Sequence, residues 1–203
     1  MLKKFIPLAA ATAALLAFAA PVAQAEGPLI TNAFGEAAKT ITARSASTTI
    51  IHTSAGMLQC ANVTLNIGIE SNENTTARGK GNGTAEGTSL GNFYGHCGSS
   101  SGTVVEVTNV TISDFHLANY GGETKGTTSF SFTYDLRSAT GASLIAECTF
   151  GGTVPVRRSG QSTLSFLTGE IKKTGGSLFC PSSGQFTGTF TVSDELFSLA
   201  TIH

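Results

Sequence analysis

Hydrophobic and polar residues alternate along many short stretches of this chain, which is the period of a β-strand with one buried face. The clearest stretch places Phe130, Phe132, Tyr134 and Leu136 on one face and serine, threonine and aspartate on the other. Turn residues separate about nine or ten such stretches, and no stretch has the period of an amphipathic helix. The pattern predicts an all-β fold, either an antiparallel β-sandwich or a partly closed barrel.

Two irregularities interrupt the alternation. Val105 and Val107 alternate with polar residues, but Val110 and Ile112 continue one position out of phase. A β-bulge at Thr108 and Asn109 would restore a single buried face. Residues 71–96 are rich in glycine, asparagine and threonine, and this composition predicts a hairpin or a long loop.

The N-terminal residues 1–25 have the pattern of an export signal. Lys3 and Lys4 precede an uncharged apolar run, and Ala23-Gln-Ala25 matches the small-residue cleavage site. A transmembrane anchor is the alternative, because the run is about long enough to span a bilayer. We expect residues 26–47 to form an arm, partly disordered or an edge strand, and residues 48–203 to form one β-sandwich domain that does not span a membrane.

Four cysteines in an exported chain predict disulfide bonds. Each half of the chain reads as strand, cysteine, excursion, Cys-x-Ser-Ser and strand, which favours the pairs Cys60–Cys97 and Cys148–Cys180. The alternative pairs Cys60 with Cys148 and Cys97 with Cys180. The repeated pattern also suggests two related halves, and the absence of a Cys-x-x-Cys pair argues against a zinc site.

Charge limits the classes of partner. Charged residues make up only 12% of the chain, and without Lys3 and Lys4 ten basic side chains stand against thirteen acidic ones. This balance gives no reason to expect nucleic acid or an anionic membrane as a partner.

Candidate catalytic chemistry is sparse. Asp114 and His116 are two residues apart on a predicted strand, so they share a face and could serve a hydrolase. His52 could join them to hold a metal. The ordinary interpretation is a solvated strand face, and we expect no catalytic residue, no metal and no cofactor.

Phenylalanine is abundant, with 13 residues, whereas tryptophan is absent. Most of these rings fall at buried alternating positions, which is typical of a core. The sharper hypothesis is a pocket for a small apolar ligand. Its candidate lining residues are Phe130, Phe132, Phe166, Phe186 and Phe190.

Three motifs carry a family resemblance: Ser54-Ala-Gly-Met-Leu-Gln-Cys60, Cys148-Thr-Phe-Gly-Gly-Thr153 and the segment 180–192, which opens Cys180-Pro-Ser-Ser. The frame resembles secreted bacterial four-cysteine β-sandwich proteins of unknown function. A fainter likeness runs to exported activator proteins of alkane oxidation. The resemblance implies a disulfide-bonded β-fold and assigns no catalytic residue.

These patterns together favour a secreted, non-enzymatic protein that acts as a surface-interaction or structural module. Its partner would be a protein or a component of the cell surface. A carrier or sensor of a small apolar ligand is the alternative, and a hydrolase is the second alternative.

Overall fold

A computed structural model describes residues 27–45, 49–53, 56–60, 62–85, 97–99, 104–193 and 195–197. The predicted signal peptide and His96 lie outside these residues. The described part is all-β, as the alternation predicted, and it contains thirteen strands rather than nine or ten. The additional strands are short segments of three to six residues, in which a period of two is hard to recognise.

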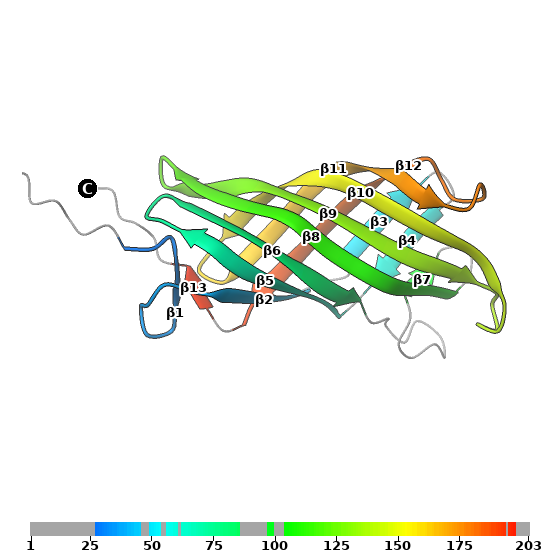
Figure 1. Cartoon of the computed structure of the whole chain (residues 1–203), viewed down its shortest axis with the longest axis horizontal. Coiled ribbons are helices and arrows are strands. Elements are labelled where there is room, and N and C mark those ends of the chain that lie inside the picture. The colour runs from blue at the N-terminus through cyan, green and yellow to red at the C-terminus, as the bar shows by residue number, and fades with distance from the viewer. Residues whose placement is uncertain are drawn as a thin grey trace, which may run out of the picture.

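Five strands form a continuous antiparallel meander that runs the length of the molecule (Figure 1). Each pairs with the next along the chain through a hairpin. They are β8 (Val104–Tyr120), β9 (Glu123–Arg137), β10 (Leu144–Ser159), β11 (Thr163–Gly176) and β12 (Ser183–Val192).

Two sets of three shorter strands close this meander into a barrel. The first set bridges β12 to the later part of β8 and consists of β2 (Thr40–Ser45), β5 (Val63–Asn72) and β6 (Thr76–Ala85). The second set bridges the start of β12 to the start of β8 and consists of β3 (Thr49–Thr53), β4 (Gly56–Cys60) and β7 (Cys97–Ser99). The eleven strands therefore form one sheet that closes on itself.

The N-terminal segment covers one end of the barrel, which we call the capped end. There β1 (Ile30–Asn32) pairs with β13 (Glu195–Phe197), and Leu29 and Ile30 are fully buried. The Asn72 side chain accepts a hydrogen bond from the Ile30 N–H and donates to the Ile30 carbonyl. Leu29 also donates its N–H to the Glu73 carbonyl, so the cap is fixed to the β5–β6 turn.

One strand of the segment 26–47, which we expected to form an arm or an edge strand, belongs to the barrel wall. β2 lies between β5 and β12, and it buries Ile41 and Ala43. The sequence signal was weak because only two positions of this strand face the core.

The opposite end, which we call the disulfide end, carries both disulfide bonds. Cys60–Cys97 joins β4 to β7, and Cys148–Cys180 joins β10 to the turn before β12. This confirms the predicted pairing. The suggested two halves do not form separate sheets, because strands from both halves belong to the single closed sheet. No helix within the described residues is long and apolar enough to cross a membrane.

The predicted bulge in β8 is confirmed. Its register with β9 shifts between Val107 and Asn109, and a second shift, which the alternation did not reveal, lies between Ile112 and Asp114. Together they keep Val105, Val110 and Phe115 buried.

We expected residues 71–96 to form a hairpin or a long loop, and their described part, up to Ala85, belongs to the hairpin of β5 and β6. Gly79, Gly81 and Gly83 lie on the inner face of β6 and pair with residues of the neighbouring strand β5. A Cβ atom at Gly81 would overlap the carbonyl oxygen of Asn66, so the two backbones approach too closely for any side chain. Glycine is typical of loops, but in β6 it allows the backbones of β5 and β6 to approach closely.

Candidate functional site

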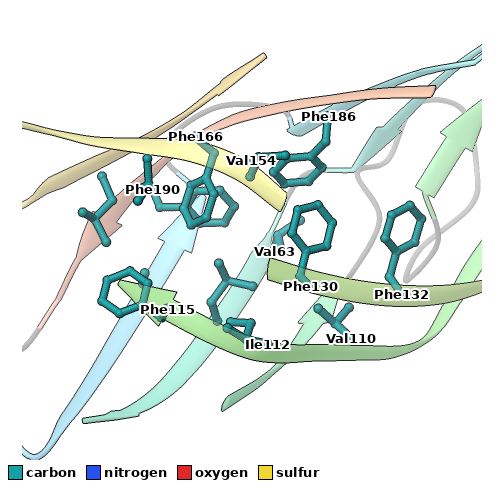
Figure 2. Close-up of a cluster of buried hydrophobic side chains, with 14 of the residues drawn as sticks. Val63, Val110, Ile112, Phe115, Phe130, Phe132, Val154, Phe166, Phe186 and Phe190 are labelled. Carbon is teal, nitrogen blue, oxygen red and sulfur yellow. The ribbon is translucent and has the colours of Figure 1, made fainter. Parts of the chain in front are cut away.

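The barrel interior contains an apolar cavity of about 50 Å³. Four of the five phenylalanines that we predicted for a pocket line it: Phe130, Phe132, Phe166 and Phe186. They project inward from β9, β11 and β12, and Figure 2 shows Phe130 and Phe186 facing each other. The fifth, Phe190, is fully buried beside the cavity and packs edge-on against Phe166, with ring centroids 5.0 Å apart.

An aromatic cluster extends from the cavity toward the disulfide end. The ring of Phe132 stacks on Phe150 at a centroid distance of 5.8 Å, and Phe150 stacks on Tyr134 at 5.9 Å. Burial raises the pKa of the Tyr134 hydroxyl to about 12, because the charged phenolate would lose its hydration. This part of the interior is therefore a packed core.

Thr128 places one hydroxyl group among these apolar side chains. Its side chain lines the cavity, the residue is 1% exposed, and its Oγ1 atom has no hydrogen-bond partner. A buried hydroxyl without a partner destabilises the fold unless a ligand or water satisfies it. Sequence reasoning missed Thr128, although its position two residues before Phe130 places both on the same face of β9.

The size of the cavity limits what it can hold. Pockets for drug-sized ligands usually enclose about 300–1,000 Å³, and an engineered cavity that takes up benzene measures about 150 Å³. At about 50 Å³, this cavity admits only a few non-hydrogen atoms unless the surrounding rings rotate. It also suits water poorly, because a buried water needs two or more polar partners.

Asp114 and His116 lie on the outer face of β8, and both are partly exposed. They stand opposite Ser129 and Thr127 of β9. His52 lies elsewhere, on β3 beside Gln185 of β12, so the structure does not bring the three residues together. Within the described residues, no three or more His, Cys, Asp or Glu side chains gather where they could hold a metal ion.

A continuous field of hydroxyl groups covers the outer face of β8, β9 and β10, and we call it the hydroxyl face. The register aligns its side chains in rows across the three strands. Cross-strand hydrogen bonds join Ser129 to Thr153 at 2.7 Å and Thr133 to Thr149 at 3.1 Å. The hydroxyl face comprises Asn109, Thr111, Ser113, Thr127, Ser129, Ser131, Thr133, Thr149 and Thr153.

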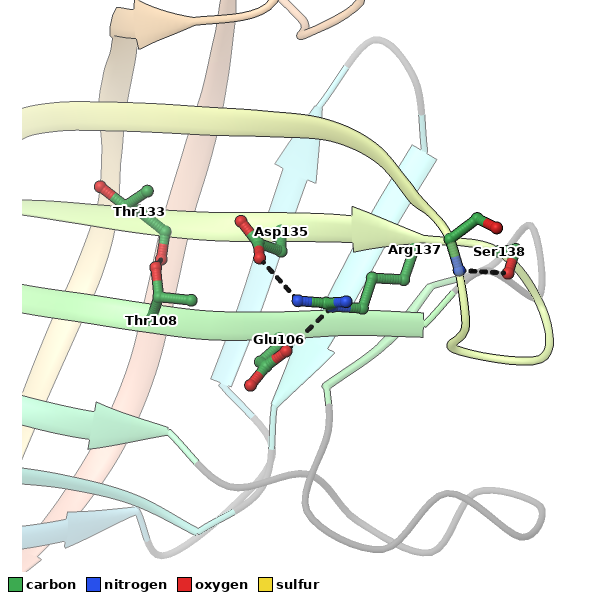
Figure 3. Close-up of polar contacts among 7 residues, drawn as sticks. Glu106, Thr108, Thr133, Asp135, Arg137 and Ser138 are labelled. Atoms are coloured by element: carbon green, nitrogen blue, oxygen red, sulfur yellow. Dashed lines mark hydrogen bonds and ion pairs between the residues drawn. The ribbon is translucent and has the colours of Figure 1, made fainter.

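Ion pairs lie beyond both ends of the hydroxyl face. Toward the disulfide end, the Arg137 guanidinium lies 3.0 Å from Glu106 and 3.0 Å from Asp135, as Figure 3 shows. Toward the capped end, Arg157 pairs with Glu123 at 3.0 Å. These ion pairs lie at the margins, whereas Asp114 lies among the hydroxyls, opposite Ser129 of β9.

A polar hollow of about 290 Å³ lies at the capped end, between the β8–β9 and β10–β11 turns. Its lining includes Thr124, Arg157, Arg158 and Gln161. The Nε of Arg158 donates to the Gly160 carbonyl at 2.7 Å, and burial lowers the pKa of this guanidinium. Arg158 thus braces the β10–β11 turn.

Comparison with known proteins found no relative: no family model, no curated protein and no solved structure matches the chain.

Proposed function

We propose that this protein is an exported, non-enzymatic interaction module that binds its partner through the hydroxyl face. Export is supported by the two disulfide bonds, which are typical of extracellular proteins. The observation that carries the proposal is the ordered array of hydroxyls across β8, β9 and β10.

The chemistry of the hydroxyl face defines the partner. Cross-strand bonds such as Ser129 with Thr153 fix the positions of the hydroxyls, so less side-chain entropy is lost on binding. Each hydroxyl retains capacity for a further hydrogen bond. Hydroxyls far outnumber the one carboxylate on this face, that of Asp114. Its partner is therefore a surface with many hydrogen-bond donors and acceptors, on a cell-surface polymer or a protein.

Charge inserted into the hydroxyl face tests the proposal. Thr111 and Thr153 are both exposed, so the double variant Thr111→Lys/Thr153→Lys should fold normally. We expect its binding to intact cells of the producing organism to fall at least tenfold. The matched control is Thr84→Lys, an exposed threonine on the outer face of β6. Equal binding of all three proteins would refute the proposal.

Thr128 and the cavity around it support a second candidate, a carrier or sensor of a small apolar ligand. An apolar cavity with one polar group is the usual form of such a site. Native mass spectrometry followed by organic extraction would test it. A co-purifying small molecule that disappears in Ala85→Leu, a variant that fills the cavity wall, supports the carrier. A bare protein mass contradicts it.

A further inference from the structure

Two neighbouring apolar side chains protrude from the disulfide end. Leu178 is 96% exposed and Phe179 is 82% exposed. Both lie in the turn between β11 and β12, at the right-hand end of the barrel in Figure 1. We call this pair the apolar tip. Exposed large apolar side chains are common singly, but adjacent ones at a protruding turn mark an interaction site.

The turn that carries the apolar tip is held in place by hydrogen bonds. The Ser177 N–H donates to the Glu147 carbonyl of β10 at 2.9 Å, and the Cys180 N–H donates to the Ser177 carbonyl at 3.1 Å. The ammonium of Lys173 donates to the same Ser177 carbonyl at 3.0 Å. Phe179 donates its N–H to the Ser177 hydroxyl at 3.2 Å.

The disulfide bond from Cys180 to Cys148 ties the same turn to β10. The apolar tip therefore stands on a braced turn that cannot fold its side chains inward without breaking these bonds. The fold itself therefore keeps Leu178 and Phe179 exposed.

The neighbouring hairpin adds apolar surface at the same end. Leu144 is 55% exposed and Ile145 is 48% exposed, and both open β10 three to four residues before Cys148. Because Cys148 pairs with Gly176, this hairpin and the apolar tip extend from the same end of the sheet. Four of the seven large apolar side chains that are exposed among the described residues gather here.

We propose that the disulfide end docks on the surface of a phospholipid bilayer, with Leu178 and Phe179 inserted into the interfacial region. Leucine and phenylalanine are the side chains that interfacial segments bury at the boundary between headgroups and acyl chains. A convex tip needs no complementary groove in a fluid bilayer, whereas a folded partner would have to provide one.

The area of the apolar cluster also favours a bilayer over a second protein. If a fully exposed large side chain presents about 150–200 Å², the four together present roughly 500 Å². A standard protein interface needs about 800 Å² from each partner. Insertion of a few side chains gives weak, reversible binding, comparable to that of a single acyl chain at about 10⁴ M⁻¹.

Charge at this end has both signs. The cation Lys173 contacts Ser177 below the apolar tip, and the carboxylate of the exposed Glu147 follows Ile145 on β10. Docking should therefore depend on apolar insertion, vary little with salt and require no anionic lipid.

Tryptophan fluorescence tests the insertion directly, because the chain has no tryptophan. Phe179→Trp introduces one reporter at the apolar tip. Phe34→Trp is the matched control, since Phe34 is 90% exposed at the capped end. With phosphatidylcholine vesicles, the emission of Phe179→Trp should shift to shorter wavelength and that of Phe34→Trp should not. Equal shifts, or no shift at either position, would overturn the proposal.

Vesicle co-sedimentation of the purified protein provides the second measurement. Leu178→Ser/Phe179→Ser should lower the partition coefficient at least tenfold, and Phe34→Ser should leave it unchanged. A concentration-dependent dimer that the double serine variant abolishes would replace the bilayer by a second copy and overturn the proposal. Both tests leave Thr111 and Thr153 intact, so they are independent of the hydroxyl-face proposal.

Discussion

The rings of Phe130 and Phe186 lie 4.7 Å apart, centroid to centroid, at an angle of 57°. Phe130 belongs to β9 and Phe186 to β12, and these strands are not neighbours in the sheet. The contact therefore crosses the interior of the barrel. Phe166 of β11, the strand next to β12, meets Phe186 edge-on with centroids 6.0 Å apart, so the aromatic contact continues along that wall.

We expect this contact to appear as coupling in a double-mutant cycle. Phe130→Leu and Phe186→Leu each leave a void and should destabilise the protein by about 1–3 kcal/mol. The double variant should lose about 0.5–1.5 kcal/mol less free energy of unfolding than the two single variants added together. The reason is that each single variant already removes the contact between the two rings. Urea unfolding measures the free energies. The control cycle combines Phe130→Leu with Phe190→Leu, whose ring packs on Phe166 instead, and additivity in the first cycle would contradict the coupling.

Gly81 provides a test of the close approach between β5 and β6. Gly81→Ala places a Cβ atom against the Asn66 carbonyl, so the backbone must shift, and we expect a loss of about 2–4 kcal/mol. Gly98→Ala in β7 is the control, because a Cβ atom there meets nothing within 4 Å. Thermal unfolding should separate the two variants clearly, and similar melting temperatures would show that β6 can move away from β5.

The sequence predicted those features of the fold that depend on local alternation. A strict period of two identified the buried face of β9, from Phe130 to Leu136, and a single phase slip located the bulge after Val107. The repeated cysteine pattern also predicted both disulfide bonds. In each case the signal lies within one strand or in the spacing of one residue type.

The remaining features depend on which strands meet in space. The sequence left a hairpin and a long loop open for β6, because glycine at positions 79, 81 and 83 is typical of loops until the backbone of β5 is placed beside it. Closure of the sheet rests on the pairing of β2 and β3 with β12, which are far apart in sequence. Thr128 was missed because a hydroxyl in a threonine-rich segment resembles a solvent-facing residue until its neighbours are known.

The disulfide bonds should contribute strongly to stability. Each closes a loop of more than thirty residues, with sequence separations of 37 and 32, and the chain-entropy model gives about 3–4 kcal/mol for each. Cys60→Ser/Cys97→Ser should therefore lower the free energy of unfolding by this amount. Treatment of the wild type with a reductant is the control for the substitution itself. A variant as stable as the oxidised wild type would contradict the prediction.

Because its hydroxyl is buried, Tyr134 should make the folded protein less stable in alkaline solution. Burial raises its pKa to about 12 in the folded protein, against an ordinary value of 10.0 in the unfolded chain. The neutral form is favoured in the fold, so its contribution is complete below pH 10 and is lost as the pH rises from 10 to 12. Two pKa units correspond to at most about 2–3 kcal/mol. Tyr134→Phe should flatten this alkaline decline in urea unfolding, and an unchanged decline would show that other groups cause it.

Thr128 provides the most direct test of the cavity. The shape of valine matches that of threonine, and the hydroxyl it would replace has no partner inside an apolar cavity. Thr128→Val should therefore raise the free energy of unfolding by about 1–3 kcal/mol, since a buried donor without a partner carries its full desolvation cost. Thr133→Val is the matched control: its hydroxyl bonds Thr149 at 3.1 Å on the hydroxyl face, and its loss should cost about 1 kcal/mol. If Thr128→Val is the destabilised variant, the Thr128 hydroxyl has a bound partner in solution, and the cavity is occupied.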